Sequence, residues 1–129
     1  MIVLDTHIWI WWVDNNLKLT QRQRELINTY QSSGLGISII SCWEVAKLVE
    51  NQKLILSCSV DEWLNGGLAY PGVQLLSLTL PIIVASTELT GFHRDPADQL
   101  IVATAQIYNC SLLTADNKIL AYPHVQTLI

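Results

Sequence analysis

The sequence predicts an α/β fold, a single domain with a mostly parallel central sheet of four to five strands and helices on both faces. Short apolar runs that suit buried strands alternate along the chain with segments that carry helix-start signals. Strands that alternate with helices form parallel sheets whose connecting helices cover both faces. The chain has 129 residues, of which 50% are apolar, and it contains no repeat or linker. We therefore expect residues 1–129 to fold as one domain with one active site.

The N-terminal part of the chain predicts one strand and two helices. Residues 2–4 form a short apolar strand that stops at Asp5. The Trp-rich residues 8–13 follow and suit a buried helix better than a second strand. A capping-box pattern then opens an amphipathic helix over residues 20–30. Asp5 is therefore expected at the junction between the first strand and the first helix.

The middle of the chain repeats the order of strand and helix. Residues 36–40 predict the second strand. Ser41 with Glu44 is again a capping-box pattern, which predicts a helix over residues 41–50. Residues 61–69 predict a further helix, closed by a turn that contains proline and glycine. Glu44 is thus expected in the first turn of the helix that follows the second strand.

The C-terminal half predicts the rest of the sheet and its cover. Residues 73–78 predict the third strand, and a proline in the first turn favours a helix over residues 79–91. An aspartate followed by proline marks the start of a helix over residues 96–108, which is apolar on most sides and should pack deeply. Residues 111–113 predict a short strand, followed by one helical turn. Residues 125–129 predict an edge strand.

Acidic residues lie at or just beyond the ends of these apolar runs. They are Asp5, Glu44, the pair Asp95 and Asp98, and Asp116. The carboxyl ends of parallel strands meet at one edge of a sheet, and open α/β sheets bind ligands in the crevice there. We therefore expect these acids to face one crevice although they are far apart in the sequence.

Each acid taken alone also has a purely structural explanation. Asp5 and Asp95 suit helix N-caps, and Glu44 suits the N3 partner of a cap. Asp98 suits a first turn and Asp116 a loop. The set is harder to explain, because like charges about 5 Å apart repel by about 3 kcal/mol per pair at an effective dielectric of about 20. A hard divalent cation offsets that repulsion, and oxygen-only ligands select Mg²⁺ or Mn²⁺ over zinc. Such ions promote phosphodiester hydrolysis, which is the leading reaction class.

The same residues carry a family resemblance. They are Asp5-Thr6, Ser41 and Glu44, Asp95-Pro96-Ala97-Asp98, and Thr114-Ala115-Asp116. With this spacing the chain resembles the PIN-domain family over nearly its full length, and most closely the VapC-like toxins of bacterial toxin–antitoxin pairs. The resemblance implies an endoribonuclease that depends on Mg²⁺ or Mn²⁺, acts on RNA, is inhibited by an antitoxin protein and forms a homodimer.

The resemblance also implies roles for individual residues. The metal-site and catalytic acids would be Asp5, Glu44, Asp98 and Asp116. Thr6 and Thr114 would orient these acids, and Asp95 would be peripheral. Ser41 has no histidine base placed near it in the sequence, so we expect a helix cap and a hydrogen-bond donor to a carboxylate rather than a nucleophile.

One position departs from the family pattern. Many such toxins carry arginine directly after the acid at Asp98, whereas this chain has Gln99. A direct contact between position 99 and the RNA backbone is therefore not expected. Arg94 is an alternative cation, although a solvated loop charge explains it equally well.

Histidines and tryptophans offer further candidates. His7, His93 and His124 are scattered and make no pair at metal-ligand spacing, so we expect them to be structural or exposed. His7 is the exception, because its place two residues after Asp5 suits a substrate contact or a proton shuttle. The five tryptophans suit core packing or a protein interface better than a platform for RNA bases. An apolar helix face with Trp9 and Trp12 would suit an antitoxin segment.

The net charge and the cysteine content argue against several kinds of binding surface and structural site. The formal net charge of −4 and the pI near 5.1 exclude a broad basic surface, so a polyanionic substrate needs local cations such as Lys47, Arg94 and Lys118. The three cysteines are widely spaced and contain no C-x-x-C pair, which indicates neither a disulfide framework nor a zinc knuckle. With no basic leader and no apolar run long enough for a bilayer, we expect a cytoplasmic protein without membrane contact.

Two other functions compete with the nuclease. In the first, Asp5 is itself a nucleophile, as in haloacid-dehalogenase-like phosphatases that pass through an aspartyl-phosphate. That family would require a second aspartate two residues later, where this chain has His7. In the second, the chain is a catalytically silent PIN-like scaffold that binds RNA or protein. The presence of all four acids argues against a silent scaffold.

Overall fold

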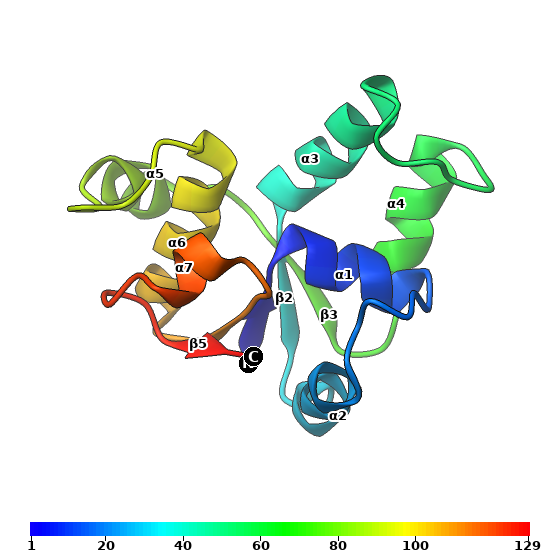
Figure 1. Cartoon of the computed structure of the whole chain (residues 1–129), viewed down its shortest axis with the longest axis horizontal. Coiled ribbons are helices and arrows are strands. Elements are labelled where there is room, and N and C mark those ends of the chain that lie inside the picture. The colour runs from blue at the N-terminus through cyan, green and yellow to red at the C-terminus, as the bar shows by residue number, and fades with distance from the viewer.

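The computed structural model describes residues 1–129 and contains one five-stranded sheet in the order β3-β2-β1-β4-β5. All four pairs of neighbouring strands are parallel. The strands are β1 (Ile2–Leu4), β2 (Leu35–Ser38), β3 (Val73–Leu76), β4 (Leu112–Leu113) and β5 (Thr127–Leu128). The predicted α/β fold with a parallel central sheet is confirmed (Figure 1).

Helices cover the sheet and alternate with its strands along the chain. They are α1 (Thr6–Val13), α2 (Gln21–Tyr30), α3 (Ile39–Glu50), α4 (Val60–Leu68), α5 (Leu80–Thr87), α6 (Pro96–Tyr108) and α7 (Asn117–Leu120). The capping box predicted for α2 is present, with the Thr20 side chain accepting from the Gln23 backbone. No helix is both long and apolar enough to cross a membrane.

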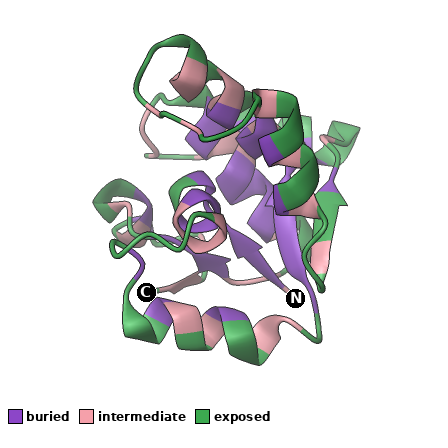
Figure 2. Ribbon diagram, turned by 90° about the vertical axis from the view of Figure 1, so that its right-hand side faces the viewer, coloured by how far each residue is buried: buried purple, intermediate pink, exposed green.

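The sheet separates two hydrophobic cores. Successive side chains of a strand point to opposite faces, so Ile2 and Leu4 of β1 enter one core and Val3 enters the other. Helices α1 to α4 contribute to the first core, where the fully buried Trp9 packs edge-on against Trp63. Helices α6 and α7 contribute to the second core. Figure 2 shows the buried strands enclosed by helices whose outer surfaces are exposed.

The predicted boundary between β2 and α3 is wrong. We expected a strand through residue 40 and a cap at Ser41, but the strand ends at Ser38, whose Oγ accepts a hydrogen bond from the Ile40 backbone at 3.2 Å. Ile39 and Ile40 are therefore helical, and Ile40 packs against the second core. Ser41 lies inside the helix and is fully buried. Tertiary packing overrides the capping-box pattern here.

Smaller differences concern the ends of other elements. Helix α1 begins at Thr6 because Asp5 caps it, two residues before the predicted start. Helix α5 ends at Thr87 rather than at residue 91, and β3 ends at Leu76 rather than at residue 78. The last strand is shorter than predicted and lies at the sheet edge, as expected. The order of elements is unchanged, so β1, β2 and β4 all deliver their carboxyl ends to one edge.

Candidate metal centre

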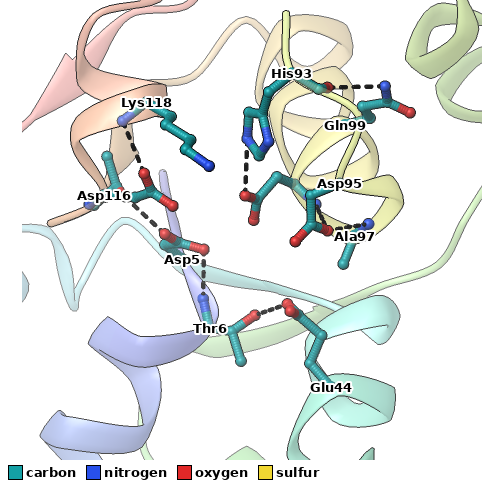
Figure 3. A network of polar contacts seen from close by, with 11 residues as sticks. Asp5, Thr6, Glu44, His93, Asp95, Ala97, Gln99, Asp116 and Lys118 are labelled. Carbon is teal, nitrogen blue, oxygen red and sulfur yellow. Dashed lines mark hydrogen bonds and ion pairs between the residues drawn. The ribbon is translucent and has the colours of Figure 1, made fainter.

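A cavity of about 280 Å³ lies at the carboxyl edge of the sheet. It is lined by eight residues, which are Asp5, His7, Trp11, Glu44, Asp95, Asp98, Ala115 and Asp116. The four acids predicted as a set therefore share one cavity, together with Asp95. Figure 3 shows carboxylates pointing into a common space from the ends of separate elements.

Asp5 is held at the end of β1 by hydrogen bonds to both of its carboxylate oxygens. Its Oδ1 accepts from the Thr6 backbone at 2.8 Å, and its Oδ2 accepts from Thr114 Oγ1 at 2.7 Å. Thr114 Oγ1 also accepts from the Asp116 backbone at 3.0 Å. One threonine at the end of β4 thus ties two acids from different strands together.

Glu44 is anchored through Thr6. The Thr6 hydroxyl contacts Oε1 of Glu44 (Figure 3). It also lies 2.9 Å from Oγ of Ser41. These contacts join the first turn of α1 to the interior of α3. The structure therefore places Ser41 against Thr6 and not against a carboxylate, so its predicted direct hydrogen bond to an acid is wrong.

Asp98 sits in the first turn of α6, where Asp95 is the N-cap. Asp95 Oδ1 accepts from the backbones of Ala97 and Asp98 at 3.0 and 3.3 Å. His93 Nε2 lies 3.0 Å from Asp98 Oδ2, although its N–H is not aligned for a hydrogen bond. Gln99 donates to the His93 carbonyl at 3.0 Å (Figure 3). Position 99 thus holds the loop that carries His93 and does not line the cavity.

Burial and mutual repulsion hold several carboxyl groups near their protonated forms. Burial is the main cause that raises the pKa of Asp98 to about 8, and the charges of the other four cavity acids add to it. Burial likewise raises the pKa of Glu44 to about 7, opposed by the contact with Thr6. The pKa of Asp5 is raised by burial, against hydrogen bonds that lower it. Negative charge at this edge is costly without a counter-ion.

The donor set fits a hard divalent cation, because the cavity offers carboxylate oxygens and no cysteine. No three of the cavity's side chains stand close enough together in this conformation to ligate one ion directly. Mg²⁺ keeps several of its waters and takes only one or two carboxylates as direct ligands, so a hydrated ion suits this spacing. Asp5, Glu44, Asp98 and Asp116 would hold it.

Of the other residues that the sequence suggested for the site, some lie at the cavity and some do not. His7 is exposed and lines it, which fits the predicted approach to a substrate. Lys118 gives its backbone N–H to Asp116 at 2.8 Å, and Figure 3 shows its side chain beside that acid. Arg94 is exposed and does not line the cavity. Lys47 lines a neighbouring groove instead.

The sequence did not reveal two members of the site. Trp11 lines the cavity, although core packing or a protein interface was the favoured expectation for the tryptophans. His93 was expected to be structural or exposed, but it lies against Asp98. A histidine five residues before an acid has no diagnostic spacing, because the loop between them can take many conformations.

Comparison with known proteins identifies relatives over almost the whole chain. The sequence model of the PIN domain matches residues 2–125. The chain is 28% identical over 124 residues to the protein named Ribonuclease VapC22 from Mycobacterium tuberculosis, and this match covers 95% of this chain and 92% of that protein.

Solved structures share the fold. FitAcB from Neisseria gonorrhoeae superposes with a TM-score of 0.71 at 21% identity, covering 100% of this chain and 97% of that one. VapBC2 from Rickettsia felis, bound to a DNA fragment from its promoter, gives 0.69 at 18% identity, covering 99% of this chain and 98% of that one. A toxin–antitoxin complex from Klebsiella pneumoniae gives 0.69 at 16% identity, with 100% and 97% covered.

Proposed function

The chain belongs to the PIN-domain family, and on that basis we propose that residues 1–129 form one nuclease domain that hydrolyses RNA phosphodiester bonds with Mg²⁺ or Mn²⁺. The observation that carries the proposal is the convergence of Asp5, Glu44, Asp98 and Asp116 on one cavity. These acids come from four separate elements, and helix caps alone need not converge. The relative named as a ribonuclease supports the same reaction class.

The four acids hold the cation and set its position at the carboxyl edge of the sheet. When bound, Mg²⁺ or Mn²⁺ lowers the pKa of water and stabilises the charge that develops on the phosphate. Asp5 is the most buried of the four acids and is fixed by two hydrogen bonds, so it defines the floor of the site. Asp98 and Glu44 line the same cavity from α6 and α3.

Threonines keep these acids in position. Thr114 bridges Asp5 and the backbone of Asp116, and Thr6 contacts Glu44. Both threonines are buried, so neither is free to turn toward solvent. Ser41 supports Thr6 from inside α3. Such supporting hydrogen bonds fix the orientation of metal ligands.

The solved structures that share the fold suggest a protein partner for this chain. Solved neighbours include a toxin–antitoxin complex, and we propose that this chain is the toxin of such a pair, restrained by a cognate antitoxin in the cytoplasm. We also propose a homodimer. Helix α5 exposes Leu80, Ile83 and Val84, whose spacing places them on one face that a second copy would cover. Co-purification with a small protein encoded next to this chain would test the first partner, and sedimentation the second.

Loss of single carboxylates tests the reaction. Asp5→Asn and Asp98→Asn keep the shape of the side chain but remove its charge, so RNA cleavage in Mn²⁺ should fall by about a hundredfold or more. Asp61→Asn is the matched control, because Asp61 is an exposed acid of α4 that does not line the cavity. Cleavage is measured on purified protein freed of any partner, with and without chelator.

Two outcomes would contradict the nuclease. Full cleavage by either variant, or by the parent in excess chelator, would show that the acids do not hold an essential ion. RNA binding without cleavage by the parent in Mn²⁺ would instead identify a silent scaffold.

A further inference from the structure

A second opening lies directly beside the acidic cavity. It is a groove of about 430 Å³ lined by nine residues, which are Trp43, Glu44, Lys47, Leu48, Asn51, Lys53, Asp95, Pro96 and Ala97. Two of these, Glu44 and Asp95, also line the acidic cavity, so the two openings share a wall. The groove lies between the outer face of α3 and the first turn of α6, and Figure 1 shows these helices on either side of the same sheet edge.

We propose that this groove binds the unpaired nucleotides of the RNA strand next to the bond that is cut, with one base stacked on Trp43 and backbone phosphates held by Lys47 and Lys53. This inference rests on the proposed nuclease function. It adds a binding subsite that determines which flank of the substrate is held.

Trp43 is unusual among the tryptophans of the chain. Trp9 and Trp63 are buried, and Trp11 and Trp12 are partly buried, whereas Trp43 is 53% exposed. Its ring therefore contributes little to the core and presents an aromatic surface to the groove. Proteins that hold single strands stack bases on such rings, and every base offers a face for this contact.

Two of the four charged side chains that line the groove, Lys47 and Lys53, can hold phosphates of an RNA backbone. The chain has only seven lysines and arginines in all, and two of them, Lys47 and Lys53, line this groove while none lines the acidic cavity. Lys47 Nζ contacts Glu50 Oε1 at 2.8 Å, and both side chains are solvent-exposed. An exposed pair of this kind is weak and can be exchanged for a phosphate. Lys47 Nζ also lies 5.9 Å from the centre of the Trp43 ring.

Geometry favours a nucleic-acid strand over a peptide helix. A strand whose reacting phosphate lies among the acids must continue into an adjoining opening, and this groove shares two acidic residues with that cavity. Its wall is mixed, because Trp43, Leu48, Pro96 and Ala97 supply apolar surface beside the ammonium groups of Lys47 and Lys53. A helix that docks by its apolar face needs a mostly apolar groove. In this groove two ammonium groups lie beside an aromatic ring, a combination that resembles the surfaces that bind single-stranded nucleic acid.

The test measures RNA binding separately from cutting. Fluorescence anisotropy with a short labelled single-stranded RNA of mixed sequence is recorded in Mg²⁺ on an Asp5→Asn background, in which cleavage is blocked. Trp43→Ala should weaken binding by about tenfold, which corresponds to about 1.4 kcal/mol. Trp43→Phe should restore most of it, because the ring is kept. Leu17→Ala is the matched control, since Leu17 is a 97% exposed apolar residue outside the groove.

The salt dependence of RNA affinity tests the role of the lysines. Lys53→Ala should weaken binding and lower the dependence of log affinity on log salt by about 0.7, which is the contribution of one phosphate contact on a single strand. Lys53→Arg should keep both the affinity for RNA and its salt dependence. Lys18→Ala is the control, because Lys18 is exposed and lies outside the groove. Melting temperatures of the Trp43 and Lys53 variants should stay close to that of the Asp5→Asn background, since Trp43 is half exposed and Lys53 is exposed.

Failure of this inference can be told apart from failure of the nuclease. Unchanged RNA affinity in Trp43→Ala and Lys53→Ala overturns the groove even if the parent cuts RNA. Affinity that falls as expected supports the groove even if the parent fails to cut. Loss of binding to a protein partner with RNA affinity unchanged would assign the groove to a peptide and also overturn the proposal.

Discussion

At the scale of single residues, three acids of the site serve two purposes. Asp5, Asp95 and Asp116 each cap a helix with a carboxylate oxygen and line the cavity as well. A carboxylate has about four acceptor sites, so a cap that uses one or two of them leaves others for a cation. For Asp5 and Asp116, a cap and the proposed role in metal binding are therefore compatible.

The raised carboxyl pKa values predict an unusual pH dependence of stability. Between the unfolded pKa values of about 4 and the folded values of about 7 for Glu44 and about 8 for Asp98, the folded protein binds more protons than the unfolded chain. The free energy of unfolding should therefore fall as pH rises through this window. We expect the metal-free protein to melt at least about 3 °C lower at about pH 8 than at about pH 5. A loss of about 1 kcal/mol in the free energy of unfolding lowers Tm by about 2–8 °C.

Two controls identify the cause of this pH effect. Mg²⁺ should raise Tm more at pH near 8 than at pH near 5, because the ion binds ionised carboxylates. Asp98→Asn should reduce the loss of stability, because one of the three carboxyls with a raised pKa no longer titrates. A melting temperature that is flat or rises across the window would show that these carboxyls are not destabilised by the fold.

At the scale of elements, the N-cap of α6 separates stability from catalysis. Asp95→Ala removes both cap hydrogen bonds and should lower the free energy of unfolding by about 1 kcal/mol, whereas Asp95→Asn should be within a few tenths, because asparagine caps as well as aspartate. Since we propose that Asp95 is peripheral, Asp95→Asn should keep cleavage within about tenfold of the parent. Urea titration and cleavage assays measure the two effects. Equal stability of both variants would exclude a capping role.

Two neighbouring glycines of α4 provide a second test of packing. A Cβ at Gly66 would meet no atom within 4 Å, whereas a Cβ at Gly67 would lie 3.1 Å from Cζ2 of the fully buried Trp9. Gly66→Ala should therefore stabilise the protein by up to about 1 kcal/mol. Gly67→Ala should gain less or lose stability, because the buried ring cannot move freely. If thermal melting gave the same gain for both, Trp9 would not be packed as described.

The start of α3 shows where sequence patterns are insufficient. Ser38 and Ser41 are both good caps, and Glu44 at the right spacing favoured Ser41. The helix begins after Ser38 because that start buries Ser41 against Thr6 and packs Ile40 on the second core. Neither contact can be seen locally, since each depends on a partner distant in the sequence.

At the scale of the whole molecule, the order of elements was more predictable than the details of the site. Alternation of apolar runs with capped helices was sufficient to predict the parallel sheet and the edge at which Asp5 and Asp116 meet. The hydrogen bond from Thr114 to Asp5 and the contact of His93 with Asp98 depend on side-chain directions and on a loop, which no periodicity encodes. The groove beside the cavity likewise requires α3 and α6 to be placed in space.

The central claim is that carboxylates from separate elements hold one divalent cation. Its most direct test is a crystal structure of the parent protein soaked in Mn²⁺, in which anomalous scattering locates the ion. We predict a Mn²⁺ peak inside the cavity, contacted directly or through bound water by at least two of Asp5, Glu44, Asp98 and Asp116. A saturating soak that leaves this cavity without Mn²⁺, or that places the ion only elsewhere, would contradict the account.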